Sequence, residues 1–171
     1  MTAAPPVIVC MGVSGSGKST LAAALATSIG AEYIDADDFH SVENRQKMSA
    51  GIPLTDADRT PWMQRVIDHL NRLHSPCVIA HSALRRAHRE QLRRQSAATH
   101  FLFLQSDPDD LRERLRRRLG HFMSPALIDS QFAALEQPDD EADVTVIDAG
   151  NAPQRVLADA LRAIEEYRNA S

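Results

Sequence analysis

Short runs of apolar residues alternate along the chain with longer stretches in which apolar positions recur at helical spacing. The apolar runs show little internal alternation of polar and apolar residues, which is typical of strands covered on both faces of a sheet. We expect strands in the sequences VIVCMG (7–12), EYIDAD (32–37), CVIAHSAL (77–84), HFLFLQ (100–105) and DVTVIDA (143–149). Helices are expected at 18–30, 60–74, 85–95, 109–118, 125–135 and 153–167. This alternation predicts an α/β fold with a doubly wound, parallel, five-stranded sheet flanked by helices.

Two polar segments interrupt the alternation, at about 40–58 and about 119–124. They are candidates for a substrate-binding insertion and a lid that closes over it. The chain has 171 residues, of which 43% are hydrophobic, enough for one substantial core. We therefore expect one domain over 1–171 that carries both insertions.

Composition limits the cellular compartment and the classes of binding partner that we expect. The formal net charge of −4 argues against general electrostatic attraction to nucleic acid. The two cysteines, Cys10 and Cys77, lie inside apolar runs, which predicts buried reduced thiols and a cytoplasmic protein. The first residues lack a basic region ahead of an apolar stretch, and the run VIVCMGV is too short to span a bilayer, so no membrane partner is expected.

The stretch MGVSGSGKST (11–20) carries the strongest chemical signal. Gly12, Gly17, Lys18 and Ser19 satisfy the P-loop pattern G-x-x-x-x-G-K-[ST], placed between an expected strand and an expected helix. Backbone N–H groups and the helix amino terminus would hold phosphates, Lys18 would reach the outer phosphates, and the Ser19 hydroxyl would bind Mg²⁺. The residues expected to contact ATP here are Gly12, Ser14, Gly15, Ser16, Gly17, Lys18, Ser19 and Thr20.

A P-loop serves both nucleotide switches and kinases, and the remaining sequence favours a kinase. The chain lacks the N-K-x-D motif by which guanine-specific switches read the base. Two polar insertions and arginine-rich helices suit phosphoryl transfer to a small molecule in a site that closes against water. A noncatalytic nucleotide-sensing module remains the alternative from another class.

Two carboxylates follow the second expected strand. In the sequence DADDFH, Asp35 and Asp37 would lie on the same side of an extended segment, because side chains alternate with period two. One carboxylate could hold the waters of Mg²⁺ while the other accepts the proton of an acceptor hydroxyl. Aspartates in polar loops also serve as caps or turns, so their position after a strand of a P-loop fold is what favours catalysis.

Several long motifs occur in the same order as in a known family. The segments GVSGSGKS, KMSAGIPLTDADRTPW, HSALRRAHRE and RLGHFMSPALIDSQFAALEQP resemble those of the gluconokinases, from the P-loop to beyond Pro138. This resemblance implies ATP-dependent, Mg²⁺-assisted phosphorylation of D-gluconate at the 6-hydroxyl, which gives 6-phosphogluconate. It also implies a homodimer. Shikimate kinase and nucleoside monophosphate kinases are alternatives of the same fold, but the segment 40–62 matches neither as well.

The resemblance also implies roles for individual residues. Asp37 would be the catalytic base, assisted by Lys18 and Arg118, and Asp35 would support the metal beside Ser19. The implied substrate-binding residues are Asp37, His40, Arg59, Ser82, Arg85, Arg89 and His121. Arg114 and Arg118, four apart on one helix face, would contact ATP together with Pro153.

Three positions depart from the family pattern in the segment HSALRRAHRE. His81 stands where the family has cysteine, Arg85 where it has lysine, and His88 where it has tyrosine. Arg85 keeps the positive charge of lysine, but a planar guanidinium meets an anion in a different geometry from an ammonium group.

Overall fold

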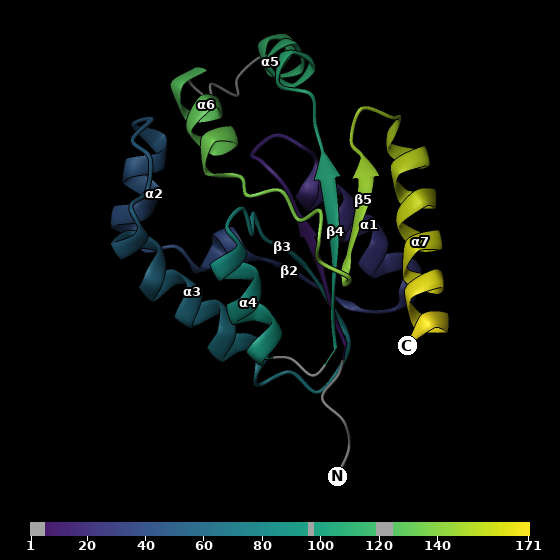
Figure 1. The fold of residues 1–171 in the computed structure, drawn as a ribbon. Helices are drawn as coiled ribbons and strands as arrows, with labels where there is room; N and C mark the ends of the chain where they lie inside the picture. The colour runs from purple at the N-terminus through teal and green to yellow at the C-terminus, as the bar shows by residue number, and fades with distance from the viewer. Residues whose placement is uncertain (1–5, 96–97, 119–124) are drawn as a thin grey trace.

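The computed structural model describes residues 6–95, 98–118 and 125–171. Within them, five parallel strands form one sheet in the order β2-β3-β1-β4-β5 (Figure 1). The strands are β1 (Val7–Met11), β2 (Glu32–Asp35), β3 (Cys77–Ala80), β4 (Thr99–Gln105) and β5 (Val144–Asp148). The parallel α/β sheet and all five strands expected from the sequence are confirmed.

Helices connect the strands, as the doubly wound topology requires. They are α1 (Lys18–Ile29), the short 3₁₀ helix η1 (Ala36–Phe39), α2 (Val42–Ser49), α3 (Asp56–Leu70), α4 (Arg86–Gln95), α5 (Pro108–Arg117), α6 (Pro125–Ala134) and α7 (Pro153–Ala170). Gly30 ends α1 in the left-handed conformation, with φ 68°, and its backbone N–H donates to Ala26 O. The expected end of this helix is therefore correct.

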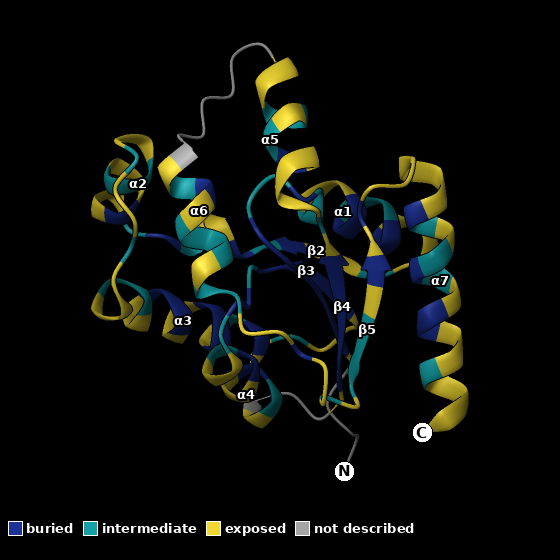
Figure 2. Ribbon diagram, turned by 45° about the horizontal axis from the view of Figure 1, so that its top comes forward, coloured by how far each residue is buried: buried dark blue, intermediate teal, exposed yellow. Residues whose placement is uncertain are grey.

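Both faces of the sheet are covered, which explains why its strands lack polar alternation. Val9 and Phe101 face a core built with α3 and α4, whereas Cys10 and Leu102 face a second core built with α1 and α7. The central strands are uniformly buried, while the outward sides of the helices are exposed (Figure 2). Cys10 and Cys77 are buried free thiols, as the apolar context predicts.

The third helix begins earlier than its apolar pattern indicates. The sequence predicts a helix at 60–74, but α3 spans Asp56–Leu70. Thr55 caps its amino terminus: the Thr55 hydroxyl accepts from Asp58 N–H, and the Asp58 carboxylate accepts from Thr55 N–H. Because this capping box lies in the polar segment, and because Pro61 lies inside the helix, the first turn reads as a loop in the sequence.

The polar segment 40–58 contains a helix that hydrophobic periodicity does not reveal. Helix α2 is capped by Ser41, whose hydroxyl accepts from Asn44 N–H at 3.1 Å. It lies at the periphery of the molecule, away from the sheet (Figure 1), and Val42 is 65% exposed. A helix that buries so little apolar surface has no apolar stripe to detect.

The connections at the carboxyl ends of the strands form the functional edge of the sheet. The loop after β1 leads into α1, β2 leads into η1, and β3 leads into the segment 81–85 ahead of α4. Helices α5 and α6 lie above this edge (Figure 1), where Leu111 and Ile128 pack with Val13 and Leu84. Ligands of open parallel sheets bind at this edge, so the fold gathers the candidate residues there.

The buried face of β4 gives a prediction for stability. Leu102 is fully buried against α1 and α7, so Leu102→Ala should lower the free energy of unfolding by about 2–5 kcal/mol through lost burial and a residual cavity. Val146, on the adjacent strand, is 51% exposed, so Val146→Ala should change the free energy of unfolding by about 0.5 kcal/mol or less. Urea unfolding of both variants measures the difference, and equal losses would contradict this account of the core.

Candidate active site

The loop between β1 and α1 is shaped as a cradle for an anion. Gly12 has φ 147°, and a Cβ there would lie 2.8 Å from Leu104 O, so only glycine fits. Gly17, at φ 97°, precedes α1 and provides no side-chain cap for its first N–H groups. The amino terminus of α1 can therefore donate its backbone hydrogens to phosphate oxygens.

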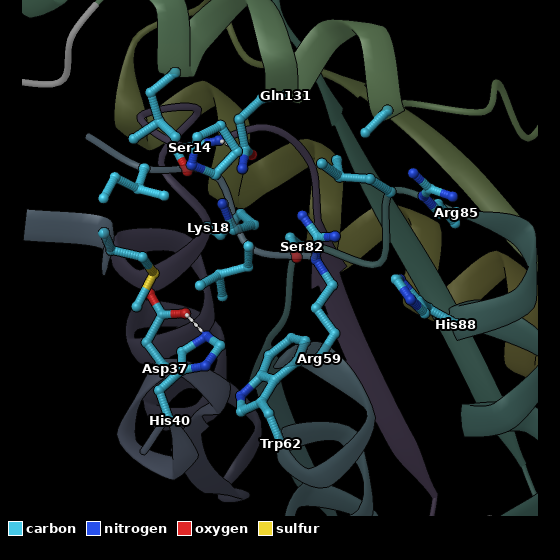
Figure 3. Close-up of a pocket in the computed structure, with 17 residues that line it drawn as sticks. Ser14, Lys18, Asp37, His40, Arg59, Trp62, Ser82, Arg85, His88 and Gln131 are labelled. Carbon is cyan, nitrogen blue, oxygen red and sulfur yellow. Dashed lines mark hydrogen bonds and ion pairs between the residues drawn. The ribbon is translucent and has the colours of Figure 1, made fainter. Parts of the chain in front are cut away.

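Lys18 brings the positive charge of this cradle to the cleft. Its Nζ donates to Val13 O at 3.0 Å, which folds the side chain over the loop. Burial lowers the pKa of Lys18, and the negative charges of Asp37 and Asp35 partly oppose this shift. The side chain points into the same cavity as Asp37 (Figure 3), so a phosphate and a base could meet there.

A cavity of about 480 Å³ lies beside the P-loop, between α1, α5 and the turn that joins β5 to α7. Arg114 is fixed at its wall, because its Nη2 donates to Ala149 O at 3.1 Å. The turn 149–152 completes the wall. The sequence motifs did not indicate that this turn belongs to the site, although the pair Gly150–Asn151 is a local signal for a turn. The predicted nucleotide residues that line this cavity are Ser16, Gly17, Thr20, Arg114, Arg118 and Pro153.

Ser19 and Asp35 form a pair of oxygen ligands at the edge of the cleft. The Ser19 hydroxyl donates to Asp35 Oδ2 at 2.9 Å, and the Tyr33 hydroxyl donates to the same oxygen at 3.2 Å. A hydroxyl and a carboxylate suit Mg²⁺, which commonly takes a few protein oxygens and fills its remaining positions with phosphate and water. The described part of the chain has no group of three or more His, Cys, Asp or Glu side chains able to hold a metal alone.

Asp35 and Asp37 are close neighbours, but for a different reason from the expected one. Asp35 ends β2, and the chain then turns into η1 instead of continuing as a strand. Asp35 caps η1, since its Oδ1 accepts from Asp37 N–H at 3.0 Å. This bond holds the Asp35 carboxylate against the backbone of Asp37, and the strand alternation inferred from the sequence is wrong at this point.

The surroundings of Asp37 suit a base. Desolvation in the cleft raises the pKa of Asp37, the charge of Asp35 raises it further, and Lys18 lowers it. His40 Nε2 lies 3.6 Å from Asp37 Oδ1 (Figure 3). Burial and nearby arginines lower the pKa of His40 to about 4, so the ring is neutral at pH 7. Asn44 Nδ2 donates to His40 Nδ1, which leaves the proton on Nε2, directed toward Asp37.

Next to Asp37 is a pocket with walls from five parts of the chain. They are the P-loop, η1, the segment from α2 to α3, the residues after β3, and α6 (Figure 3). The predicted residues that line it are Ser14, Lys18, Asp37, His40, Arg59, Ser82 and Arg85, of which Ser14 was expected to contact ATP. Met48, Trp62, His88, Leu127 and Gln131 also line it, and of these the sequence singled out His88 alone, as a departure from the family pattern. Gln131 closes the pocket against the P-loop, because its Oε1 accepts from Ser14 N–H at 3.2 Å.

The pocket contains two guanidinium groups that face one carboxylate. Arg59 Nη1 lies 3.7 Å from Asp56 Oδ1, and Arg85 Nη1 lies 3.5 Å from Asp56 Oδ2. Burial and the charge of Arg85 lower the pKa of Arg59 from its high ordinary value, which leaves it a cation at pH 7. Two cations with one internal anion leave an excess positive charge, suited to an acidic ligand.

Arg89 does not line the pocket, which corrects its expected role in binding substrate. Its side chain is fully buried, and its Nη1 donates to Ala83 O at 2.8 Å and Leu84 O at 3.1 Å. Its remaining nitrogens donate to Glu136 O and the Glu141 carboxylate. The guanidinium is therefore engaged by the protein itself. His121 and the expected lid at 119–124 lie outside the described residues.

Comparison with known proteins agrees with this geometry. A family model described as an AAA domain matches residues 7–138. The thermosensitive gluconokinase of Escherichia coli K12 is 41% identical over 164 residues, which cover 94% of this chain and 88% of that protein. The crystal structure of a gluconokinase from Sinorhizobium meliloti 1021 superposes with a TM-score of 0.90 at 38% identity, covering 97% of this chain and 95% of that one.

The comparison also finds a more distant protein that shares the fold. A shikimate kinase from Aquifex aeolicus superposes with a TM-score of 0.63 at 17% identity, which shows a shared fold alone. No helix among the described residues has both the length and the apolar character needed to cross a membrane. With a P-loop, a carboxylate pair and a dibasic pocket in one cleft, and with near-complete coverage of its relatives, the chain belongs to the gluconokinase family.

Proposed function

We propose that this protein transfers the γ-phosphoryl group of ATP to a hydroxyl of D-gluconate and forms 6-phospho-D-gluconate. The observation that carries the proposal is the shared pocket in which Lys18 of the P-loop faces Asp37, with Arg59 and Arg85 on the opposite side (Figure 3). One end of the pocket thus suits a transferring phosphate and the other suits a carboxylate. Gluconate has a carboxylate at one end and a primary hydroxyl at the other.

The acceptor would be held by complementary charge and by hydrogen bonds. Arg59 and Arg85 would bind the carboxylate, with the planar guanidinium of Arg59 able to meet it in a bidentate manner. Ser82 lines the same pocket, and its hydroxyl can hydrogen-bond hydroxyl groups of the acceptor, while His40 lines it beside Asp37. This orientation directs the distal hydroxyl toward Asp37.

Transfer would then require loss of the acceptor proton and stabilisation of phosphate charge. Asp37 accepts the hydroxyl proton, and the His40 Nε2–H helps to hold the carboxylate in place. Lys18 and the backbone N–H groups of the P-loop stabilise the negative charge on the phosphoryl oxygens. Arg118, exposed at the end of α5 and lining the nucleotide cavity, would add a further cation beside Arg114.

Mg²⁺ fits beside the P-loop, with Ser19 and Asp35 as its protein ligands. When bound, it would neutralise part of the negative charge on the phosphoryl oxygens during transfer. Tyr33 would keep the Asp35 carboxylate oriented through its hydroxyl. The homodimer implied by the family resemblance and the cytoplasmic location expected from the two cysteines remain predictions.

The function is tested by ADP release from the purified protein with Mg-ATP and one acceptor at a time. D-Gluconate should stimulate release strongly, whereas glucose, shikimate, AMP and buffer alone should give little. Glucose is the informative comparison, because it has the same carbon number and a similar terminal hydroxyl but lacks the carboxylate. Equal stimulation by shikimate would favour the alternative acceptor, and no stimulation by any of them would favour a nucleotide sensor.

Arg59→Lys should mainly impair the use of gluconate. A point charge cannot reproduce a planar two-point contact, and a lost hydrogen bond to a charged group costs about 1.5–3 kcal/mol, so the gluconate KM should rise about tenfold or more. The KM for ATP should stay nearly unchanged, because Arg59 does not line the nucleotide cavity. Arg72→Lys, at an exposed site just beyond α3, is the matched control. A raised KM for ATP with an unchanged KM for gluconate would refute this placement.

Asp37→Asn should lower kcat by about 10²–10⁴-fold while nucleotide affinity changes little, because the base acts in the transition state. The carboxylate works when deprotonated, so activity should be present above its pKa and lost as the pH falls through it. Since that pKa is raised, this acidic loss should begin above the ordinary range of aspartate. Asp38→Asn, at the exposed neighbouring residue, is the control. Steady-state rates against pH measure both effects, and a wild-type kcat for Asp37→Asn would remove Asp37 from catalysis.

A further inference from the structure

The segment that follows β3 contains an unusual backbone conformation beside the acceptor pocket. Ala83 has φ 45°, and it is the one non-glycine residue with a positive φ among those the structure describes. Alanine adopts this left-handed conformation at an energetic cost, because its Cβ crowds the following carbonyl. Such a conformation persists where the surrounding contacts hold it, and it is often found at functional sites.

The residues around Ala83 are those that form one wall of the pocket. Ser82, Leu84 and Arg85 all line the cavity that contains Lys18 and Asp37. Ser82 O accepts from Gly12 N–H at 3.2 Å, which joins this wall directly to the P-loop. A change in the backbone at Ala83 would therefore move the hydroxyl of Ser82 and the guanidinium of Arg85 relative to the phosphate cradle.

Two buried side chains hold the two polar groups of Ala83. Its N–H donates to His81 Nδ1 at 2.9 Å, and its carbonyl accepts from Arg89 Nη1 at 2.8 Å. His81 is 1% exposed and Arg89 is 0% exposed, so water does not compete for these bonds. Leu84 O accepts both from Arg89 and from Glu136 N–H, which extends the same restraint by one residue.

The histidine is in the protonation state that this contact needs. Burial lowers the pKa of His81 to about 3, and the charges of His88, Lys18 and His40 add to this shift. The ring is therefore neutral, with a lone pair on Nδ1 and the proton on Nε2. Nε2 has no hydrogen-bond partner among the described residues, and a buried unpaired donor opposes stability. The hydrogen bond that Nδ1 accepts from Ala83 N–H thus gives a reason for a histidine at this buried position, where the unpaired Nε2–H alone would be unfavourable.

The ring also contacts the opposite wall of the pocket. His81 stacks on Trp62 with ring centroids 4.7 Å apart, and Trp62 stacks on His40 at 4.4 Å. Trp62 is itself fixed, because its Nε1–H donates to Ala36 O at 2.7 Å. The stack thus joins His81 to α3 through Trp62, although His81 itself does not line the cavity.

We propose that His81 is a positioning residue for acceptor binding: its Nδ1 holds the left-handed turn at Ala83 and so places Ser82 and Arg85 for the sugar acid. The proposal rests on the gluconate kinase activity proposed above. Arg89 supports the same turn from the carbonyl side. His81 does not touch the substrate, and its effect passes through the backbone of Ala83.

Two substitutions of equal shape isolate the acceptor atom. His81→Asn and His81→Leu both remove the ring and its stacking, but only asparagine retains an atom that can accept from Ala83 N–H. Leucine should raise the KM for gluconate about tenfold or more, as expected for loss of a buried hydrogen bond and release of the turn, with the KM for ATP within about twofold of the wild type. Asparagine should stay much closer to the wild type in both constants. Leucine leaves the buried N–H of Ala83 without an acceptor, so it should also have the lower Tm of the two variants, and the readout specific to positioning is the rise in the KM for gluconate with little change in the KM for ATP.

A second substitution tests the route through the backbone. Glycine adopts a positive φ without strain, so Ala83→Gly in the His81→Leu background should recover most of the lost gluconate affinity. His100→Leu is the control, because His100 is also buried and stacked on an aromatic ring, Tyr167, but lies outside the pocket. That variant should alter Tm with little effect on either KM.

Steady-state kinetics and thermal unfolding of these variants decide the proposal. An unchanged gluconate KM in His81→Leu would overturn it, as would equal losses in the asparagine and leucine variants or a failure of glycine to restore affinity. If His81→Leu does not fold, the asparagine variant with and without Ala83→Gly still tests it, and a large rise in KM that glycine does not reverse would refute it. Absence of gluconate-dependent ADP release in the unsubstituted protein would refute the proposed function instead.

Discussion

Parallel pairing of β1 with β3 on one side and β4 on the other is the constraint on which the site depends. It directs the carboxyl ends of three buried strands to one edge, where the P-loop, the segment 81–85 and the entry to α5 meet. The close approach of Gly12 to Leu104 O and the hydrogen bond from Gly12 N–H to Ser82 O are consequences of this arrangement. The nucleotide cradle and one wall of the acceptor pocket are thereby fixed to the same rigid sheet, and phosphoryl transfer requires reacting groups held at a defined separation.

Charges in the cleft are arranged so that each end has a different electrostatic character. The phosphate end combines Lys18 and the amino terminus of α1 with the carboxylates of Asp35 and Asp37. At the acceptor end, Arg59 and Arg85 share Asp56, which leaves an excess of positive charge. An acid-bearing sugar with a distal hydroxyl complements both ends, whereas a neutral sugar would leave the guanidinium pair without its counter-charge.

Buried polar groups around the pocket serve mainly to fix its backbone. Arg89 is enclosed by the carbonyls of Ala83, Leu84 and Glu136 and by the Glu141 carboxylate, so its charge is neutralised within the protein. Glu141 is also bonded to Arg93, which joins α4 to the segment that follows α6. Glu136 N–H also donates to Leu84 O, so these bonds join the segment after β3 to the segment that follows α6. Such a network is costly to disrupt in part, because each member left alone would be a buried unpaired charge.

The sequence by itself determined the sheet, its order of alternation with helices, and the phosphate cradle. These features follow from local patterns: unbroken apolar strands such as Val7–Met11, and a P-loop in which glycine spacing and one lysine are sufficient signals. Tertiary structure decided what local pattern could not encode. Helix α2 buries too little apolar surface to show a period, Asp35 and Asp37 meet through a cap on η1, and Arg89 is held inward partly by the Glu136 carbonyl and the Glu141 carboxylate from a distant segment. An arginine in a sequence presents the same charge to a substrate or to a backbone carbonyl, and only the packing of the folded chain determines which one it meets.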